Sequence, residues 1–168
     1  MWVMERGMFM FQSLKARFSA RSDHQDDRLN TCDDLPRLDR LRRYARDRTV
    51  RQRADARYRA LLVGGNASLR LETRVAAVRD CTDTAVLAYV ARSAREECLR
   101  REAVERLGSD RVLMEVALND SVVRLRRRAV ALMNDPVLLE DVVSRCQTGE
   151  RRIARDAAQR LRELADCA

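Results

Sequence analysis

The stretch LRREAV at 99–104 decides the fold of this chain, because it returns 26 residues later as LRRRAV at 125–130. One period upstream the chain reads TRVAAV at 73–78, and 28 residues downstream of the second copy it reads IARDAA at 153–158. A weaker copy, VRQRA at 50–54, precedes the stretch at 73–78 by 23 residues. Self-similarity at a nearly constant spacing indicates an internal repeat.

A second segment of each unit repeats with the same spacing. Its apolar residues fall at i, i+3 and i+4, which is one face of an α-helix. The matching sets are Leu87, Val90 and Ala91, then Leu113, Val116 and Ala117, then Leu139, Val142 and Val143, each 26 residues after the one before. A two-helix unit cannot bury such a stripe by itself, so we expect neighbouring units to stack and share an apolar core.

The breaks between helical patterns set the expected boundaries. We expect helices at 36–46, 49–63, 68–80, 84–94, 97–107, 111–118, 121–133, 137–146 and 150–165. Residues typical of helix ends fall between them: Gly64-Gly65, Gly108 and Gly149 as left-handed C-terminal residues, Pro36 and Pro136 in first turns, and Asp120-Ser121 and Thr148 as N-caps. No heptad runs unbroken across these breaks, which disfavours a coiled coil. The matched spacing in two different helices disfavours an ordinary bundle.

The composition favours one all-α domain with a polar N-terminal extension. The chain has 168 residues, of which 46% are apolar and only 4% aromatic, with two prolines. This mixture is typical of helices rather than of a sandwich or barrel. Residues 19–34 are polar and rich in aspartate. We therefore divide the chain into an N-terminal segment with an acidic linker at 1–34, partly disordered, and a repeat domain at 35–168.

The first 18 residues, MWVMERGMFMFQSLKARF, are apolar in patches. Glu5 and Arg6 interrupt any signal-peptide core, and no stretch reaches the roughly 20 apolar residues of a membrane span. Two alternatives stay open here. Met8 is a candidate for the true start of the chain. Residues 8–18 are a candidate for a short amphipathic helix that packs on the repeats or contacts a membrane.

The net charge indicates which kinds of partner to expect, and the cysteines indicate the cellular compartment. The net charge is +8, from 34 basic and 26 acidic residues, and Lys15 is the one lysine. This balance predicts an acidic protein partner or nucleic acid. The five cysteines, at positions 32, 81, 98, 146 and 167, are odd in number and show no CxxC spacing. We expect reduced, mostly buried thiols in a cytoplasmic protein, with no disulfide framework and no zinc site.

No catalytic pattern emerges from the residues. His24 is the one histidine and lies in the expected linker. The chain contains no HExxH, no GxxxxGK[ST] and no GxGxxG. Carboxylate pairs such as Glu96-Glu97 and Glu140-Asp141 are expected to be solvated or paired with arginines three or four residues away. We therefore expect no catalytic residue, no metal site and no cofactor.

The repeat units resemble short HEAT-like repeats of the phycobilisome-lyase type. In those repeats the second helix carries an apolar residue, Arg, two variable residues and Ala, then a small or branched residue and a Leu. This chain shows the pattern at 99–107 and, with Met133 in the last position, at 125–133. Residues 80–164 also resemble the N-terminal helical arrays of large bacterial proteins whose conserved domain has no assigned function.

The resemblance covers about residues 36–165. It implies an α-solenoid of stacked two-helix repeats, wound as a right-handed superhelix, that works as a non-catalytic protein-binding scaffold or adaptor. The chain departs from the pattern because Asp-Pro, at 135–136, does not precede most of its units. Some HEAT-like solenoids are DNA glycosylases with aromatic pockets, a role that the scarcity of aromatic residues disfavours.

Two sets of arginines carry the functional expectations. The first set occupies one position of the repeat and comprises Arg74, Arg100 and Arg126, with Arg51 aligned beside them. A second repeated position, expected to be structural, holds Ala77, Ala103, Ala129 and Ala157. We expect each of these arginines to pair with an acid or a helix C-terminus of the next unit, forming a ladder inside the stack.

The second set is expected to be exposed and comprises Arg101, Arg124, Arg127, Arg128, Arg151 and Arg155. Stacking is expected to align these side chains into a continuous positive strip. We hypothesise that the strip binds an acidic protein segment. The alternative is binding of nucleic-acid phosphates without base readout, since stacking aromatics are scarce. A membrane-surface adaptor is the weakest of the three readings.

Overall fold

The structure, a computed structural model, describes residues 28–64, 69–146 and 149–166, and within these ranges every regular element is helical. The main helices are α2 (Leu35–Tyr44), α3 (Arg48–Leu62), α4 (Leu71–Arg79), α5 (Thr84–Ser93), α6 (Glu97–Arg106), α7 (Asp110–Asn119), α8 (Val123–Leu132), α9 (Pro136–Cys146) and α10 (Arg151–Asp166). The predicted all-α class is confirmed. Each helix lies within three residues of its expected range. The segment at 8–18, His24, Gly65, Thr148 and Cys167 lie outside the described residues.

The chain divides into two compact units between Tyr58 and Arg59. In the first unit the end of the expected linker is part of the fold. Asp34 is the N-cap of α2, and its carboxylate accepts a hydrogen bond from the Arg37 backbone N–H at 2.9 Å. Arg57 donates to the Cys32 carbonyl at 3.0 Å and forms an ion pair with Asp33. Both aspartates therefore bond to residues of the first unit although they lie within the expected linker at 1–34.

The core of the first unit is small and is bordered by arginines. Leu35 and Leu38 of α2 are buried, as are Ala54 and Tyr58 of α3. The guanidinium of Arg42 lies over the Tyr58 ring, 4.8 Å from its centroid. A cation over an aromatic face covers apolar surface while the ring electrons attract its charge.

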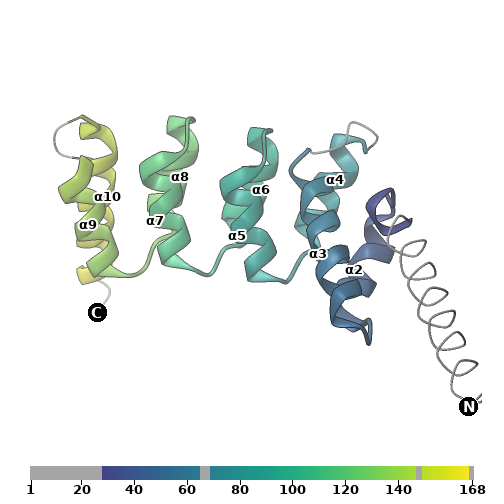
Figure 1. Cartoon of the computed structure of the whole chain (residues 1–168). Coiled ribbons are helices and arrows are strands. Elements are labelled where there is room, and N and C mark those ends of the chain that lie inside the picture. Colours follow the sequence, from purple (N-terminus) through teal and green to yellow (C-terminus); the bar gives the residue numbers. More distant parts are fainter. Residues whose placement is uncertain (1–27, 65–68, 147–148, 167–168) are drawn as a thin grey trace, which may run out of the picture. The chain divides into compact units, whose positions relative to one another are not determined.

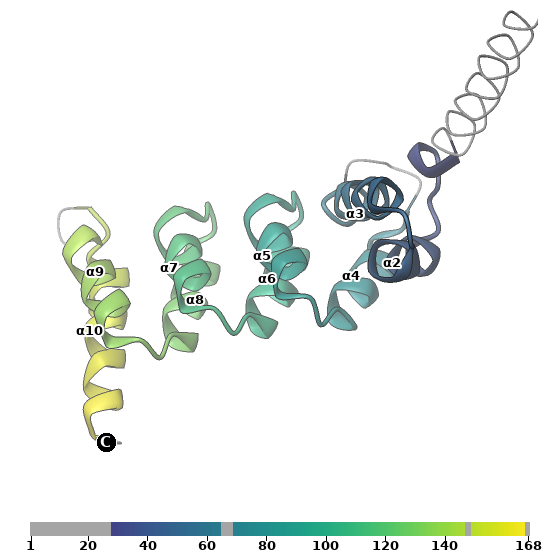
Figure 2. The same ribbon diagram turned by 60° about the horizontal axis from the view of Figure 1, so that its bottom comes forward.

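The second unit consists of helix pairs that lie side by side (Figure 1). Helix α5 contacts α6, α7 contacts α8, and α9 contacts α10. Between pairs the helices contact one another in two rows, α4–α6–α8–α10 and α5–α7–α9, as both views show (Figures 1 and 2). Helices α5 to α10 of this unit therefore pack against a pair partner and against a counterpart in a neighbouring pair, whereas α4 contacts its counterpart α6.

An apolar seam runs between the two rows, formed by equivalent residues of successive pairs. The first row contributes Leu99, Leu125, Ile153, Ala103, Ala129 and Ala157, and the second contributes Leu87, Leu113, Leu139, Val90, Val116 and Val142, all buried. Two expected members, Ala77 and Val143, are only half-buried. They lie on α4 and α9, which stand at the ends of their rows within the described second unit and so have a row neighbour on one side.

Helix ends follow the expectations only in part. Gly64 has the expected left-handed conformation, with φ of 94°. Gly108 and Gly149 do not, because the helix ends in this unit are closed by extended C-cap residues such as Leu107 and Met133. Helix α8 begins at Val123 rather than near Ser121, and the Asp120 carboxylate accepts from the Val122 N–H.

The described cysteines are free thiols. Cys81 and Cys146 are buried, whereas Cys32 and Cys98 are half-buried. Burial raises the pKa of the Cys146 thiol, so less of it is present as the reactive thiolate at neutral pH.

We predict that Leu139→Ala lowers the free energy of unfolding by about 2–5 kcal/mol, because it opens a cavity in the seam. The matched control is Val137→Ala on the same helix, where the side chain is 70% exposed. That change is expected to cost less than about 0.5 kcal/mol. Urea unfolding followed by circular dichroism measures both, and equal losses would contradict the assigned seam.

Candidate functional site

Three arginines lie buried between neighbouring helix pairs. Arg74, Arg100 and Arg126 are 6%, 8% and 8% exposed. We call them the buried ladder. They occupy one position of the repeat, on α4, α6 and α8, and therefore lie in the same row of helices.

Arg100 shows how one rung is built. Its Nε and Nη2 donate to the two carboxylate oxygens of Asp120, at 2.7 and 3.1 Å. Its Nη1 donates to the carbonyls of Ala94 and Arg95, at 3.0 and 2.9 Å. The guanidinium thus joins the C-terminal end of α5 to the loop before α8. A planar fork with several donors suits such a connection, and lysine could not replace it.

The neighbouring rungs repeat this arrangement with different acids. Arg74 donates to both carboxylate oxygens of Glu96, at 2.7 and 3.1 Å. Its Nε is buried without an acceptor among the described residues. Arg126 donates to Glu150 at 2.9 Å and to the Ala117 carbonyl at 3.1 Å. The acids of all three rungs belong to the next helix pair, as expected. The carbonyls bonded by Arg100 and Arg126 lie at the end of the partner helix of the same pair instead, and Arg74 bonds to no carbonyl of the described residues.

Arg51, the aligned arginine of the first unit, makes the two bonds to preceding carbonyls that Arg100 makes. Arg51 Nη1 donates to the carbonyls of Ala45 and Arg46, at 2.7 and 3.1 Å. These acceptors stand six and five residues before the arginine, as Ala94 and Arg95 do for Arg100. The weak sequence copy at 50–54 therefore has the same local geometry as the copy at 99–104.

The ladder shifts the ionisation of its members toward the charged forms. The hydrogen bond from Arg74 is the main cause that holds the pKa of Glu96 below its ordinary value. The hydrogen bond from Arg126 does the same for the pKa of Glu150. The hydrogen bond to Asp120 raises the pKa of Arg100. For Glu96, Glu150 and Arg100 the pKa shift therefore favours the charged form.

Half of the arginines expected on the surface strip are paired with acids of neighbouring helices. Arg124 and Arg128 of α8 reach back to Glu97 and Glu105 of α6. Arg127 of the same helix reaches forward to Asp156 of α10. The positive strip is therefore not continuous, because stacking brings carboxylates as well as arginines onto this face.

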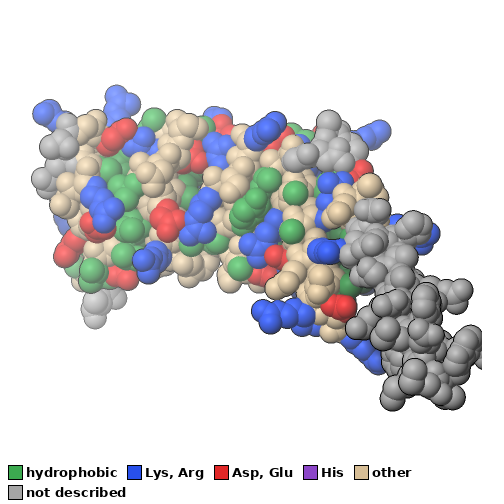
Figure 3. All heavy atoms as spheres, viewed as in Figure 1, with side chains coloured by type: hydrophobic (Ala, Val, Ile, Leu, Met, Phe, Trp, Pro, Cys, Tyr) green, Lys and Arg blue, Asp and Glu red, His purple; other side chains and the backbone are tan. Residues whose placement is uncertain are grey.

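The remaining members of the strip are exposed and unpaired. Arg101, Arg151 and Arg155 make no hydrogen bond or ion pair with the part of the chain that the structure describes. The face drawn in Figure 3 shows basic and acidic side chains interleaved, with apolar side chains between them. This face is a mixed surface rather than a uniformly basic one.

The acids pair at a distance in sequence that local rules miss. Glu97, Glu105 and Glu115 pair with arginines 27, 23 and 23 residues away, rather than three or four residues away as expected. Only pairs such as Asp141 with Arg145 follow the local rule. These separations are close to the repeat spacing, so a search for opposite charges one repeat apart would have found them.

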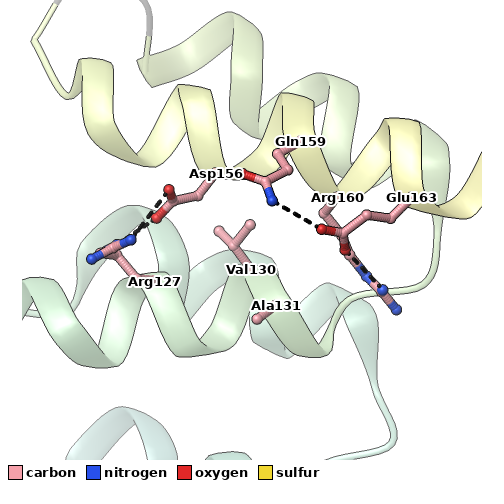
Figure 4. Close-up of a pocket in the computed structure, with 7 residues that line it drawn as sticks. All are labelled: Arg127, Val130, Ala131, Asp156, Gln159, Arg160 and Glu163. Carbon is pink, nitrogen blue, oxygen red and sulfur yellow. Dashed lines mark hydrogen bonds and ion pairs between the residues drawn. The ribbon is translucent and has the colours of Figure 1, made fainter.

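Two hollows open between α8 and α10. The first, about 200 Å³ in volume, is lined by Val130 and by the Arg127–Asp156 ion pair (Figure 4). Glu163 accepts from Gln159 and Arg160 at its other end. The second, about 310 Å³, is lined by Arg127, Arg152, Arg155 and Asp156. Its three guanidinium groups give it the chemistry of an anion site.

No group of His, Cys, Asp and Glu among the described residues has the arrangement of a metal site. Within the same ranges, none of the helices combines the length and the apolar character needed to cross a bilayer. Comparisons of this chain with known protein families, curated proteins and solved structures gave no match. Function is therefore inferred from the geometry of the described residues.

We predict that Arg100→Ala lowers the free energy of unfolding by about 3–5 kcal/mol, because the buried Asp120 carboxylate loses its counter-charge and the Ala94 and Arg95 carbonyls lose their donor. The control is Arg92→Ala, which removes the exposed pair with Glu115. That loss is expected to be below about 1 kcal/mol. Urea denaturation of both variants tests this, and similar losses would show that the rung carries no special weight.

We also predict that acid weakens the fold below about pH 5. Glu96 and Glu105 have pKa values below their ordinary value of 4.5, because arginines donate hydrogen bonds to them. The unfolded chain therefore binds more protons in this range, and stability falls as pH drops through the folded pKa values. Above pH 5 this contribution is fully present.

The Glu96→Gln variant isolates one part of that effect. Its deficit in unfolding free energy relative to the native chain is expected to shrink as pH falls from 7 to 3. A deficit that stays constant over this range would rule out the proposed role of the ionised Glu96.

Proposed function

We propose that this chain is an α-solenoid of HEAT-like repeats, wound as a right-handed superhelix, that acts as a non-catalytic scaffold for an acidic protein partner. The proposal rests on one observation. Successive helix pairs of the second unit bury equivalent apolar residues, and α4, α6 and α8 each bury an arginine that pairs with an acid of the next helix pair. Arrays built in this way present an extended, ordered surface that is suited to binding a partner.

The state of the carboxylates supports a non-catalytic role. A general acid or base works best with a pKa near the operating pH. In this structure arginine hydrogen bonds hold the pKa values of Glu97 and Glu105 below their ordinary value. Such carboxylates are ionised and engaged at neutral pH. The free thiols of the described cysteines suit a reducing compartment, and we propose that the scaffold is cytoplasmic.

The exposed arginines point to an acidic protein as the partner. Arg101, Arg151 and Arg155 are exposed and make no hydrogen bond or ion pair with acids among the described residues, although the charge of Arg101 acts on Glu97 and Glu105. Around them, Glu97, Glu105 and Asp156 interrupt the basic surface at the neighbouring positions. A nucleic-acid backbone needs a series of cationic contacts along its length. A protein segment can match an interrupted pattern of charges, so we favour a protein over the nucleic-acid alternative.

We predict that Arg101→Glu with Arg151→Glu lowers capture of the native partner by about tenfold or more, since charge reversal at a docking surface adds repulsion. The tagged full chain is used as bait in extracts of its own cell, with co-eluting proteins quantified by mass spectrometry. The control is Arg70→Glu with Arg111→Glu, two exposed arginines outside the strip. Thermal melts check that both variants are folded.

Three outcomes would count against this proposal. Unchanged capture by the variant with Arg101→Glu and Arg151→Glu would reject the exposed arginines as the docking surface. Equal loss in the control variant would show a general charge effect. Capture that nuclease treatment abolishes would favour the nucleic-acid alternative.

A further inference from the structure

The second hollow between α8 and α10 combines arginines from two helices. Arg152, Arg155 and Asp156 lie at i, i+3 and i+4 in the first turns of α10, so they share one face of that helix. Arg127 faces them from α8. The contact between α8 and α10 is thus what brings the three guanidinium groups to one open hollow of about 310 Å³.

The hollow carries an excess of positive charge that is not paired with acids of the described residues. Arg152 and Arg155 are exposed and make no hydrogen bond or ion pair with the described residues. Arg127 gives its Nε and Nη2 to the Asp156 carboxylate. Its Nη1 donates to no acceptor in the described part of the chain. Three cations thus surround one carboxylate, and this carboxylate fixes the orientation of Arg127.

The equivalent contact between α6 and α8 is more nearly neutralised. There Arg124 and Arg128 are each held by two hydrogen bonds, to Glu97 and Glu105. The hydrogen bonds from these arginines also lower the pKa values of both glutamates. Arg101 of α6 is exposed at this contact and also lowers the pKa values of the two glutamates, so three arginines there face two carboxylates. In the hollow three arginines face one carboxylate, which leaves the larger local excess. A compact anion with two charges suits such a site better than a polyanion, which needs contacts along a track.

We propose that this hollow, lined by Arg127, Arg152, Arg155 and Asp156, binds the phosphate monoester of a phosphorylated side chain on the partner protein. A phosphorylated side chain carries about −1.5 to −2 charges at neutral pH, close to the local excess. Arginine forks bind phosphate oxygens in pairs, and the N-terminal end of α10 adds partial positive charge. The inference rests on the scaffold function proposed above and names the chemistry of its partner.

The test uses small esters, so that no partner sequence is needed. The full chain is titrated with phenyl phosphate, a monoester, and with dimethyl phosphate, a diester, while NMR follows the arginine Nε–Hε signals. We expect saturable shifts of the Arg127, Arg152 and Arg155 signals with the monoester. The diester, which carries one charge and mimics a nucleic-acid backbone, is expected to bind about tenfold more weakly.

Variants assign the response to the hollow. Arg152→Gln with Arg155→Gln is expected to weaken monoester binding about tenfold or more, read from the remaining Arg127 signal. Arg70→Gln with Arg111→Gln removes the same charge elsewhere and is expected to change it less than about twofold. Asp156→Asn is expected to strengthen binding, because it removes the one carboxylate lining the hollow. A merely structural role of Asp156 would not increase affinity.

The pH dependence separates the two esters. The second pKa of a phosphate monoester is about 6, so its affinity is expected to fall between pH 7.5 and 5 as the ligand loses one charge. The groups that line the hollow are Arg127 from α8 with Arg152, Arg155 and Asp156 from α10. The three arginines stay charged throughout this range. Binding of dimethyl phosphate is expected to stay nearly constant.

Several results would overturn the phosphate site. These are no saturable shift up to about 10 mM monoester, equal affinity for both esters, or equal loss in the Arg70 and Arg111 control. A single-stranded oligonucleotide that binds more tightly than the monoester through the same arginines would replace the proposal with the nucleic-acid reading.

The failure of this inference is distinguishable from failure of the scaffold proposal. Full capture of the native partner by the Arg152 and Arg155 variant, or after phosphatase treatment of the extract, would reject the phosphate site alone. A normal response to the monoester without any captured protein would support the site and reject the scaffold.

Discussion

A guanidinium group that is buried away from water is stable only where carboxylates and carbonyls accept its hydrogen bonds. Three buried guanidinium groups connect the helix pairs of the second unit. Arg100 illustrates the constraint, because it bonds to the end of α5 and to Asp120 before α8. These contacts fix the distance and the register between pairs. The apolar seam supplies the driving force for stacking, and the buried ladder selects one arrangement among those that the seam allows.

The same stacking determines which charges are left for binding. The helices of the first row present their charged side chains to one another, so Arg124, Arg127 and Arg128 pair with acids of neighbouring helices rather than within α8. Helix α8 carries four arginines and no acid, and adjacent helices or loops supply an acid to each of them. Part of the charge that remains lies on α10, beside Arg127. A chain with an overall basic composition can thus still present a localised site.

The sequence predicted the helices, the seam and the arginines of the ladder, because all three follow from local periodicity and from spacing along the chain. It did not predict the acids. Glu96, Asp120 and Glu150 stand 22, 20 and 24 residues from their arginines, so no single spacing identifies them. The prediction of a continuous positive strip was wrong for a related reason. A helical face read in isolation shows Arg124 and Arg128 but not the glutamates that the neighbouring helix places beside them.

The most direct test of this account is a double-mutant cycle on Arg100 and Asp120, with each side chain changed to alanine singly and together. Unfolding free energies of the four proteins give the coupling energy between the two residues. The account predicts a coupling of about 2–3 kcal/mol, well above the value below about 1 kcal/mol expected for the exposed Arg92–Glu115 pair. A coupling no larger than that of the exposed pair would mean that the buried arginines do not join the repeats.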